Sequence, residues 1–374
     1  MRILVAPDKF KGSLTGVQAA EAISRGFLKV WPNAVIQIAP VADGGEGTAE
    51  ALYSVRGGEW VEVEVGDPLG RQVMARYLWQ VDTFTAVLDM SAASGLWRLE
   101  KNERDPVRAS TFGTGELILH AIRRGAKHVV VGLGGSGTND GGMGMAAALG
   151  YRFLMSDGDL MEPIPANLMS LQAITPDEAL RLPEFVAACD VGNPLLGESG
   201  ATRVFGAQKG ADAKAMEFLE AALENLADVA AERLECDFRN EPGAGAAGGL
   251  GFGLMTFCGA KIQSGFDVVA ECLGLEAAVA GADLVITGEG SLDAQTLEGK
   301  APAGVAKLAR KHGKPVIAFA GSISHAEQLH EIFDAVCPIA GGPVSVEESM
   351  RDAANLLEQS AFRTARLVQL GKIL

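Results

Sequence analysis

Two carboxylates and a lysine follow one apolar run in the segment VITGEGSLDAQTLEGKAP, residues 285–302. Glu289 and Asp293 supply the hard oxygen ligands that Mg²⁺ prefers, and Lys300 supplies a positive charge. Phosphoryl transfer needs such a set, because it depends mostly on positioning and on neutralising charge. We therefore interpret Glu289 and Asp293 as metal ligands and Lys300 as a catalytic residue. A merely polar loop is the alternative, and Pro302 would also suit a surface lysine just before a helix.

A second candidate site is the stretch APDKFKGS, residues 6–13, between the first predicted strand and the first predicted helix. Backbone N–H groups at a helix N-terminus already favour an anion. Lys9, Lys11 and Ser13 would add positive charge and a hydroxyl there, so we expect them to bind a phosphate or a substrate carboxylate. Ser13 is also predicted to be the N-cap of that helix. Ordinary surface lysines in a solvated loop are the alternative.

Acidic side chains take the corresponding place after the second predicted strand. The stretch ADGGEGT, residues 42–48, carries Asp43 and Glu46 among glycines. Carboxylates at the carboxyl end of a parallel strand bind substrate hydroxyls or Mg²⁺. We expect Asp43 and Glu46 to bind substrate. A turn that is shaped by glycine and capped by the aspartate is the alternative.

A single carboxylate stands in the stretch ACDVGNPLLG, residues 188–197. Asp190 follows an apolar run and precedes the turn at Asn193-Pro194. A carboxylate at the end of a buried segment, next to a fixed turn, is a candidate general base. We therefore predict that Asp190 is catalytic, with an Asx-type turn as the structural alternative.

The stretch GLGGSGTNDGG, residues 132–142, matches the G-x-G-x-x-G pattern of dinucleotide-binding loops. The pattern recurs in the segment 243–248, so it arises easily in a chain this rich in glycine. Neither copy lies in the first predicted β-α-β unit, where a nicotinamide-binding fold would place it. We interpret residues 132–142 as a loop shaped for close approach of a ligand, and we expect Asn139 and Asp140 to bind substrate or phosphate.

The overall charge and composition restrict the classes of partner. The chain has 374 residues, 47 of them glycine, and a formal net charge of −15. Such a charge repels polyanions, so nucleic acid and anionic membranes are excluded as partners. The five cysteines form no metal-binding or C-x-x-C pattern, which favours a reducing, cytoplasmic compartment. The uncharged segment 243–260 is too glycine-rich to span a membrane and predicts a glycine loop that leads into a buried helix.

Strand and helix patterns alternate at both ends of the chain, which is typical of a parallel sheet. Two strand patterns, RILVAP and AVIQIAP, precede residue 60, and three follow residue 260: ADLVITGEG, PVIAFAG and DAVCPIAGG. Between them, WVEVEVGDPLG, QVMARYLWQ and TFTAVLDM predict an antiparallel meander, because no helix fits between them. A long amphipathic helix is predicted over residues 213–234.

These patterns predict an α/β protein with two domains. Residues 1–60 and 260–374 would form one five-stranded, doubly wound parallel sheet, with strand 3–6 beside strand 283–287. Residues 61–259 would form an inserted α+β domain that begins with the meander.

Taken together, the motifs resemble those of the class I glycerate kinases, which phosphorylate D-glycerate with ATP. The resemblance runs nearly end to end and includes APDKFKGS, PVADGGEGT, SAASGL, TFGTGEL, GGSGTNDGGMGMAAALG, CDVGNPLLG, FGAQKGA, GAGAAGGLGFG and VITGEGSLDAQTLEGKAP. It implies a flavodoxin-like domain, an inserted domain similar to the restriction-endonuclease fold, an active site in the cleft between the domains, and Mg·ATP as phosphoryl donor. The chain departs from the family pattern at Lys9, where a small residue is usual, and at Ser291, where arginine is frequent.

We therefore predict a cytoplasmic, Mg²⁺-dependent, ATP-dependent kinase that acts on a hydroxyl of D-glycerate, and we favour 2-phosphoglycerate over 3-phosphoglycerate as the product. Its expected partners are small molecules, and homo-oligomerisation is left open. A dehydrogenase that acts on a similar hydroxy acid and a non-catalytic glycerate sensor are the alternatives.

Overall fold

The computed structural model describes residues 1–42, 47–177, 179–293, 296, 300–324 and 326–371. Within it the chain forms two compact units. The first contains Met1–Asp43, Glu50–Gly57 and Phe266–Leu374, and the second contains Gly44–Ala49 and Gly58–Gly265. The chain thus begins and ends in the same unit. Each unit has its own central sheet.

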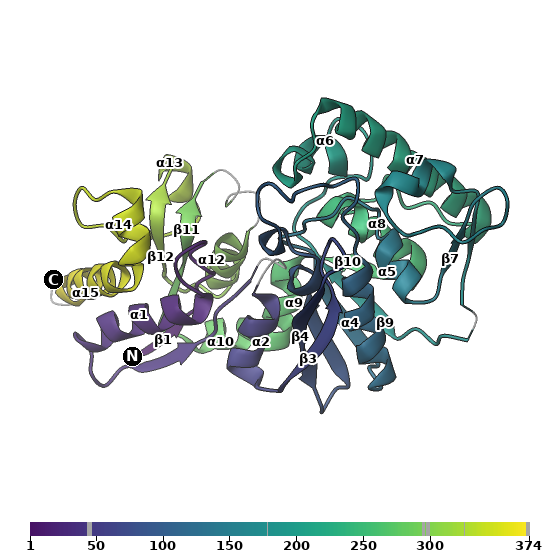
Figure 1. Cartoon of the computed structure of the whole chain (residues 1–374). Coiled ribbons are helices and arrows are strands. Elements are labelled where there is room, and N and C mark those ends of the chain that lie inside the picture. The colour runs from purple at the N-terminus through teal and green to yellow at the C-terminus, as the bar shows by residue number, and fades with distance from the viewer. Residues whose placement is uncertain (43–46, 178, 294–295, 297–299, 325, 372–374) are drawn as a thin grey trace. The chain divides into compact units, whose positions relative to one another are not determined.

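The first unit is built on a five-stranded parallel sheet in the order β13-β12-β11-β1-β2 (Figure 1). The strands are β1 (Arg2–Val5), β2 (Val35–Ile38), β11 (Leu284–Leu292), β12 (Val316–Ile323) and β13 (Ala335–Pro338). β1 pairs with β11 so that Ile3 lies opposite Leu284. The prediction that two early and three late strands share one parallel sheet is therefore confirmed, as is the pairing of strand 3–6 with strand 283–287.

Helices cover both faces of this sheet. The helices of this unit are α1 (Gly16–Leu28), α2 (Thr48–Arg56), α9 (Gly265–Leu273), α10 (Leu275–Gly281), α12 (Ala301–Lys311), α13 (Ala326–Leu329), α14 (Val346–Arg351) and α15 (Ala353–Gly371). Successive residues of β1 point to opposite faces, as a strand requires. Leu4 belongs to a core with Val305 of α12, whereas Ile3 belongs to a core with Phe27 of α1 and Leu357 of α15.

The first helix begins later than we predicted. Its N-cap is Thr15, whose hydroxyl accepts a hydrogen bond from the backbone N–H of Gln18, and the Gln18 side chain bonds back to Thr15 in a capping box. The prediction that Ser13 is the N-cap was wrong. The Ser13 hydroxyl instead donates to the carbonyl oxygen of Phe10 at 2.9 Å, which closes the loop before the helix.

The second unit has a six-stranded mixed sheet in the order β10-β9-β6-β5-β4-β3. Its strands are β3 (Glu59–Gly66), β4 (Gln72–Gln80), β5 (Thr85–Asp89), β6 (His128–Gly132), β9 (Glu184–Ala188) and β10 (Lys261–Gln263). The first three pair antiparallel, so the predicted meander is confirmed. β5, β6, β9 and β10 pair parallel, which brings the carboxyl ends of β5, β6 and β9 to one edge. β7 (Arg152–Leu154) and β8 (Ala173–Thr175) form a separate antiparallel pair.

Several short helices and one long helix pack around this sheet. They are α3 (Ser91–Ser94), α4 (Phe112–Arg123), α5 (Met143–Ala148), α6 (Ala201–Phe205), α7 (Ala213–Leu234) and α8 (Ala246–Cys258), with 3-10 turns at Leu96–Arg98, Pro165–Ser170 and Ala207–Lys209. α7 has the bounds that we predicted from its amphipathic pattern. Of the helices in the described part of the chain, none combines the length and the apolar character that crossing a bilayer needs.

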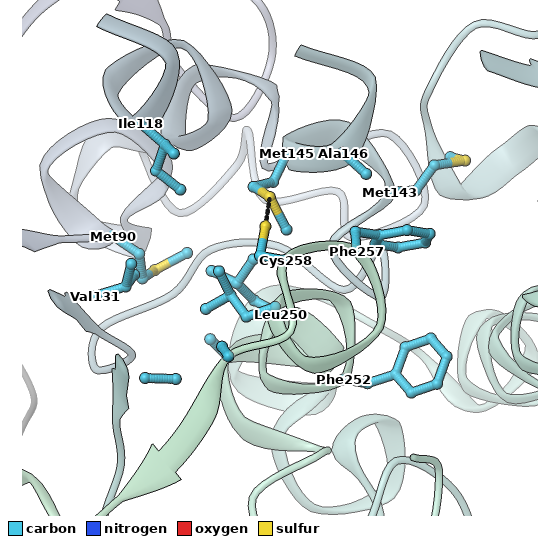
Figure 2. Close-up of a cluster of buried hydrophobic side chains, with 14 of the residues drawn as sticks. Met90, Ile118, Val131, Met143, Met145, Ala146, Leu250, Phe252, Phe257 and Cys258 are labelled. Atoms are coloured by element: carbon cyan, nitrogen blue, oxygen red, sulfur yellow. Dashed lines mark hydrogen bonds between the residues drawn. The ribbon is translucent and has the colours of Figure 1, made fainter. Parts of the chain in front are cut away.

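Part of the core of the second unit lies where α5 and α8 meet (Figure 2). Met145 of α5 and Cys258 of α8 meet there, with their sulfur atoms 3.8 Å apart, and Met90 and Val131 lie nearby. α8 is buried along most of its length, as we expected of the uncharged segment 243–260. The glycine-rich segment 132–142, just before α5, and the segment 243–248, at the start of α8, therefore adjoin the same core.

Gly248, the last glycine of the second G-x-G-x-x-G copy, packs against residues 138–141, which follow the first copy. α8 contains a left-handed kink at Ala247–Gly249, and the carbonyl oxygen of Gly248 accepts a hydrogen bond from the N–H of Gly141 at 3.1 Å. A Cβ on Gly248 would lie 2.0 Å from the carbonyl oxygen of Thr138, and one on Gly253 would lie 2.6 Å from that of Gly141. Backbone-to-backbone packing thus accounts for Gly248 and Gly253 without a dinucleotide.

We expect Gly248→Ala to destabilise the second unit strongly. The substitution adds a clash with backbone to an unfavourable φ of +68°, so it should cost about 2 to 4 kcal/mol of unfolding free energy. Gly259→Ala is the matched control, because Gly259 ends the same helix at φ +63° with no atom within 4 Å of the added Cβ. It should cost only about 1 to 2 kcal/mol. Denaturant titration of both variants checks the difference, and equal losses would contradict the packing argument.

Candidate active site

One group of candidate residues lies at the carboxyl end of β11, in the first unit. Glu289 lies within the strand, is 7% exposed, and accepts a hydrogen bond from the hydroxyl of Thr296 at 2.8 Å. The Thr296 hydroxyl oxygen in turn accepts from the backbone N–H of Asp293 at 3.2 Å. Thr296 thus links the two predicted metal ligands, and it is a residue to which we assigned no role from the sequence.

The oxygen atoms at this strand end suit a hard divalent cation. Carboxylates of Glu289 and Asp293 are accompanied by the hydroxyl of Ser291, 3.5 Å from Asp293 Oδ2, and by that of Ser322 on β12. Among the described residues, no cluster of three or more His, Cys, Asp or Glu side chains could enclose a metal by itself. Mg²⁺ usually takes only one or two protein carboxylates together with water and substrate phosphates. The residues present therefore fit Mg²⁺ bound with a phosphate substrate.

The loop after β1 lies beside this group. The backbone of residues 6–8 continues along β11, and the N–H of Asp8 donates to the carbonyl oxygen of Gly288 at 2.8 Å. A Cβ on Gly290 would lie 3.1 Å from the backbone nitrogen of Lys11. The structure therefore brings Lys9, Lys11 and Ser13 to the sheet edge that carries Glu289 and Asp293.

The side chains of this loop differ in exposure. Lys11 is exposed and Lys9 is half-buried, and the backbone N–H of Lys9 donates to Oδ1 of Asp8 at 2.6 Å. Ser13 is partly exposed and its hydroxyl donates to Phe10. The two lysines therefore supply the positive charge that we expected here.

Lys300 is the N-cap residue of α12, which has Pro302 in its first turn. Its predicted place just before a helix is therefore confirmed. The side chain is partly exposed, at the end of a helix where the partial charge is positive. The Lys300 ammonium adds a second positive charge to this helix end, which does not stabilise the helix but favours the binding of an anion. This agrees with a role in phosphate binding.

The predicted residues Asp43 and Glu46 lie outside the described residues. The next residue, Gly47, donates its backbone N–H to Oδ2 of Asp89 at 3.0 Å. Asp89 ends β5 and is 8% exposed. Sequence reasoning did not single it out, although an aspartate that ends an apolar strand is a signal of the same kind as Asp190.

Asp190 lies just after β9 and its side chain is exposed. Its Oδ1 accepts a hydrogen bond from the backbone N–H of Gly265, the first residue of α9, at 2.8 Å. A carboxylate at a helix N-terminus also interacts favourably with the helix dipole. Asp190 therefore has a structural contact in addition to the role that we predicted for it.

Asn139 and Asp140 are fully buried, and they shape the loop 132–142 from within. The Asp140 carboxylate accepts hydrogen bonds from the backbone N–H and the hydroxyl of Thr111, both at 2.7 Å, and from the N–H groups of Gly142 and Gly144, both at 3.1 Å. Burial raises the pKa of Asp140, and these hydrogen bonds act in the opposite direction. These hydrogen bonds join Asp140 to other parts of the protein, whereas from the sequence we expected Asn139 and Asp140 to contact the substrate or a phosphate.

Lys209 is a second charged side chain buried beside this loop, at 1% exposure. Its Nζ donates a hydrogen bond to the carbonyl oxygen of Thr138 at 2.7 Å. Burial lowers the pKa of Lys209 to about 7, while the neighbouring Asp140 carboxylate acts in the opposite direction. We assigned no role to Lys209 from the sequence, because its burial depends on residues that are far away in the chain.

The chemistry available at these positions is phosphoryl transfer to a small molecule. The first unit offers two carboxylates, three lysines and a helix N-terminus, which together suit a metal ion and several phosphates. The second unit offers the carboxylate of Asp190 and a glycine loop whose exposed part is Gly134–Gly135. No residue pattern here requires a nicotinamide.

Comparison with known proteins agrees with this chemistry. The family model described as the glycerate kinase family matches residues 3–369. A glycerate kinase of Bacillus subtilis (strain 168) is 46% identical, with 100% of this chain and 99% of that protein covered. A glycerate 2-kinase of Escherichia coli (strain K12) is 40% identical, with 99% of each chain covered.

A solved structure shares the fold. The crystal structure of a Salmonella typhimurium LT2 protein assigned as a glycerate kinase 2 matches with a TM-score of 0.88 and 42% sequence identity, over 100% of both chains. Similarity over the full length, in sequence and in structure, indicates the same kind of chemistry as the candidate residues do. The chain therefore belongs to the glycerate kinase family, and it is a kinase that acts on glycerate.

Proposed function

We propose that the protein transfers the γ-phosphoryl group of ATP to the 2-hydroxyl of D-glycerate and produces 2-phosphoglycerate. The observation that carries this proposal is the meeting of the Lys9–Ser13 loop with Glu289 and Asp293 at one sheet edge. Opposite charges at that edge suit a metal-bound triphosphate. The name of the Escherichia coli relative, glycerate 2-kinase, supports the 2-hydroxyl over the 3-hydroxyl as the acceptor.

In this proposal the first unit binds the anionic phosphates. Glu289 and Asp293 hold Mg²⁺, which would neutralise phosphate charge when bound. Lys9, Lys11 and Ser13 bind a phosphate or the glycerate carboxylate with the backbone N–H groups of their loop. Lys300 offsets the charge that develops on the transferred phosphoryl group, which is where positioned cations contribute most.

The second unit acts on the hydroxyl of glycerate. Asp190 accepts the hydroxyl proton as the general base. The glycine loop approaches the substrate through Gly134–Gly135, and Asn139 and Asp140 hold that loop in shape. Asp43 and Glu46 orient the substrate hydroxyls, in line with the similarity of ADGGEGT to the family motif.

The family resemblance also supports finer assignments. We infer a class I enzyme whose first unit, from residues 1–60 and 260–374, is flavodoxin-like, and the strand order supports this, because numbered within the unit it is 2-1-3-4-5. The inserted residues 61–259 would resemble the restriction-endonuclease fold. We infer a cytoplasmic enzyme with small-molecule partners, without nucleic acid or membrane, and with homo-oligomerisation left open.

ATP consumption should depend on D-glycerate. We expect little ADP from the protein with Mg·ATP alone and rapid ADP formation when D-glycerate is added, because the reacting groups are aligned only when both substrates are bound. Phosphorus NMR should then show 2-phosphoglycerate as the product. A change in nicotinamide absorbance with D-glycerate and no ADP would favour the dehydrogenase alternative, and 3-phosphoglycerate would correct the acceptor hydroxyl.

Two substitutions of Asp190 separate its base role from its structural contact. Asp190→Asn keeps an oxygen that can accept from Gly265 but removes the base, whereas Asp190→Ala removes both. If Asp190 is the base, both variants should lose roughly 10²- to 10⁴-fold in kcat. Near-normal kcat in Asp190→Asn would show that only the contact with α9 matters. Asp212→Ala is the control, because Asp212 likewise accepts from a helix N–H, that of Ala215, at 2.8 Å, and should affect stability alone.

Asp293→Asn should weaken the binding of Mg²⁺ rather than slow the chemical step itself. An amide oxygen is a poorer ligand than a carboxylate for a hard cation, so excess Mg²⁺ should restore part of the rate. The control is Asp283→Asn, which lies just before β11 and bonds to the backbone N–H of Arg2 at 2.7 Å. Initial rates measured against Mg²⁺ concentration compare the two variants, and an unchanged Mg²⁺ requirement in Asp293→Asn would remove it from the metal site.

A further inference from the structure

Lys209 has an unusual position for a lysine. It is fully enclosed in the second unit, at the end of the short turn Ala207–Lys209. Burying an ammonium group is costly unless a specific partner compensates for the lost water. The partners here are the carbonyl oxygen of Thr138, 2.7 Å from Nζ, and the charge of Asp140. Both lie on the glycine loop, so the cost of burial is offset only while that loop keeps its place.

The same short segment makes a second contact with the loop. Thr202, on α6, accepts a hydrogen bond from the side-chain amide of Asn139 at 3.0 Å, and both residues are fully buried. Residues 201–209 therefore hold the successive loop residues Thr138 and Asn139 by side-chain hydrogen bonds. Thr111 holds Asp140 from another direction. A flexible glycine-rich backbone is in this way fixed by three side chains at its inner surface.

We propose that Lys209 is a positioning residue for substrate binding, whose side-chain amino group fixes the Thr138 carbonyl and so helps to hold the glycine loop, with its turn at Gly134–Gly135, ready for glycerate. The inference rests on the proposed function, in which this turn approaches glycerate. A purely structural lysine would affect folding only. Lys209 acts on the loop that meets the substrate, so its loss should appear in substrate binding.

The informative substitution is Lys209→Met. Methionine fills a similar apolar volume and removes the buried charge, so the fold should survive. The Thr138 carbonyl loses its side-chain donor, so the loop is held less firmly at this point, while its backbone bonds to Ser94 and Leu96 remain. We expect the KM for D-glycerate to rise by roughly 10- to 100-fold, the range expected from a small misplacement of a binding group. The KM for ATP should stay close to that of the unsubstituted protein.

A matched control comes from α7. Asn225 donates its side-chain amide to the carbonyl oxygens of Leu168 and Leu171, at 2.7 and 3.2 Å, and so also holds a backbone segment of the same unit. Asn225→Leu should lower the melting temperature and leave the KM for D-glycerate unchanged. Lys209→Gln, which retains a shorter donor, is the second variant in case Lys209→Met does not fold, and it should shift the KM in the same direction.

Hydrogen exchange of the loop gives a readout that does not need activity. Amides in peptides that cover residues 132–142 should exchange faster in either Lys209 variant than in the unsubstituted protein, and Asn225→Leu should not change them. If the unsubstituted protein does not phosphorylate glycerate, the proposed function fails while exchange still tests the contact. Unchanged exchange, or faster exchange with an unchanged KM for D-glycerate, would overturn the positioning role.

Discussion

The parallel pairing of β1 with β11 is the interaction on which the first unit depends. It joins the two ends of the chain, and it continues beyond the strands through the bond from Asp8 to Gly288. Parallel strands place their carboxyl ends at one edge, so the loop that carries Lys9 and Lys11 lies beside Glu289. Two of the predicted cationic residues, Lys9 and Lys11, come from the loop after β1, whereas the predicted metal ligands, Glu289 and Asp293, come from β11 and the residues that follow it. The proposed binding of a metal-bound phosphate therefore depends on the register of one strand pair.

The second unit depends on a different constraint, the close packing of backbone on backbone. Residues 138–142 and 248–253 approach so closely that side chains are excluded between them. Glycine loses more conformational entropy on folding than any other residue, so such a loop needs other contacts to remain ordered. Asp140, Asn139 and Lys209 supply them from buried positions. The glycine content that first suggests a nucleotide fingerprint is thus largely a packing requirement.

The sequence allowed prediction of features that depend on local pattern. Apolar strand patterns indicated the five strands of the first sheet and the antiparallel strands of the second, but not β9 or β10. The amphipathic helix over residues 213–234 was placed correctly. The capping box at Thr15 and Gln18 also follows a recognisable sequence pattern, although we predicted Ser13 as the N-cap. The contacts of Asp190 with Gly265 and of Lys209 with Thr138 could not be predicted, because each joins residues more than sixty positions apart. Burial of a charge is a property of the fold and not of the local sequence.

The interrupted first unit also constrains the order in which the protein folds. Every strand of the second unit's large sheet lies between residues 59 and 263, so that sheet is complete before β11 has been synthesised. β1 and β2, although made first, must wait for β11 before they have a central partner. Long-range pairing of this kind is slow compared with local contacts. During synthesis the nascent chain therefore contains every strand of the second unit's large sheet before the edge that carries Glu289 can form, and kinase activity is among the last properties that it acquires.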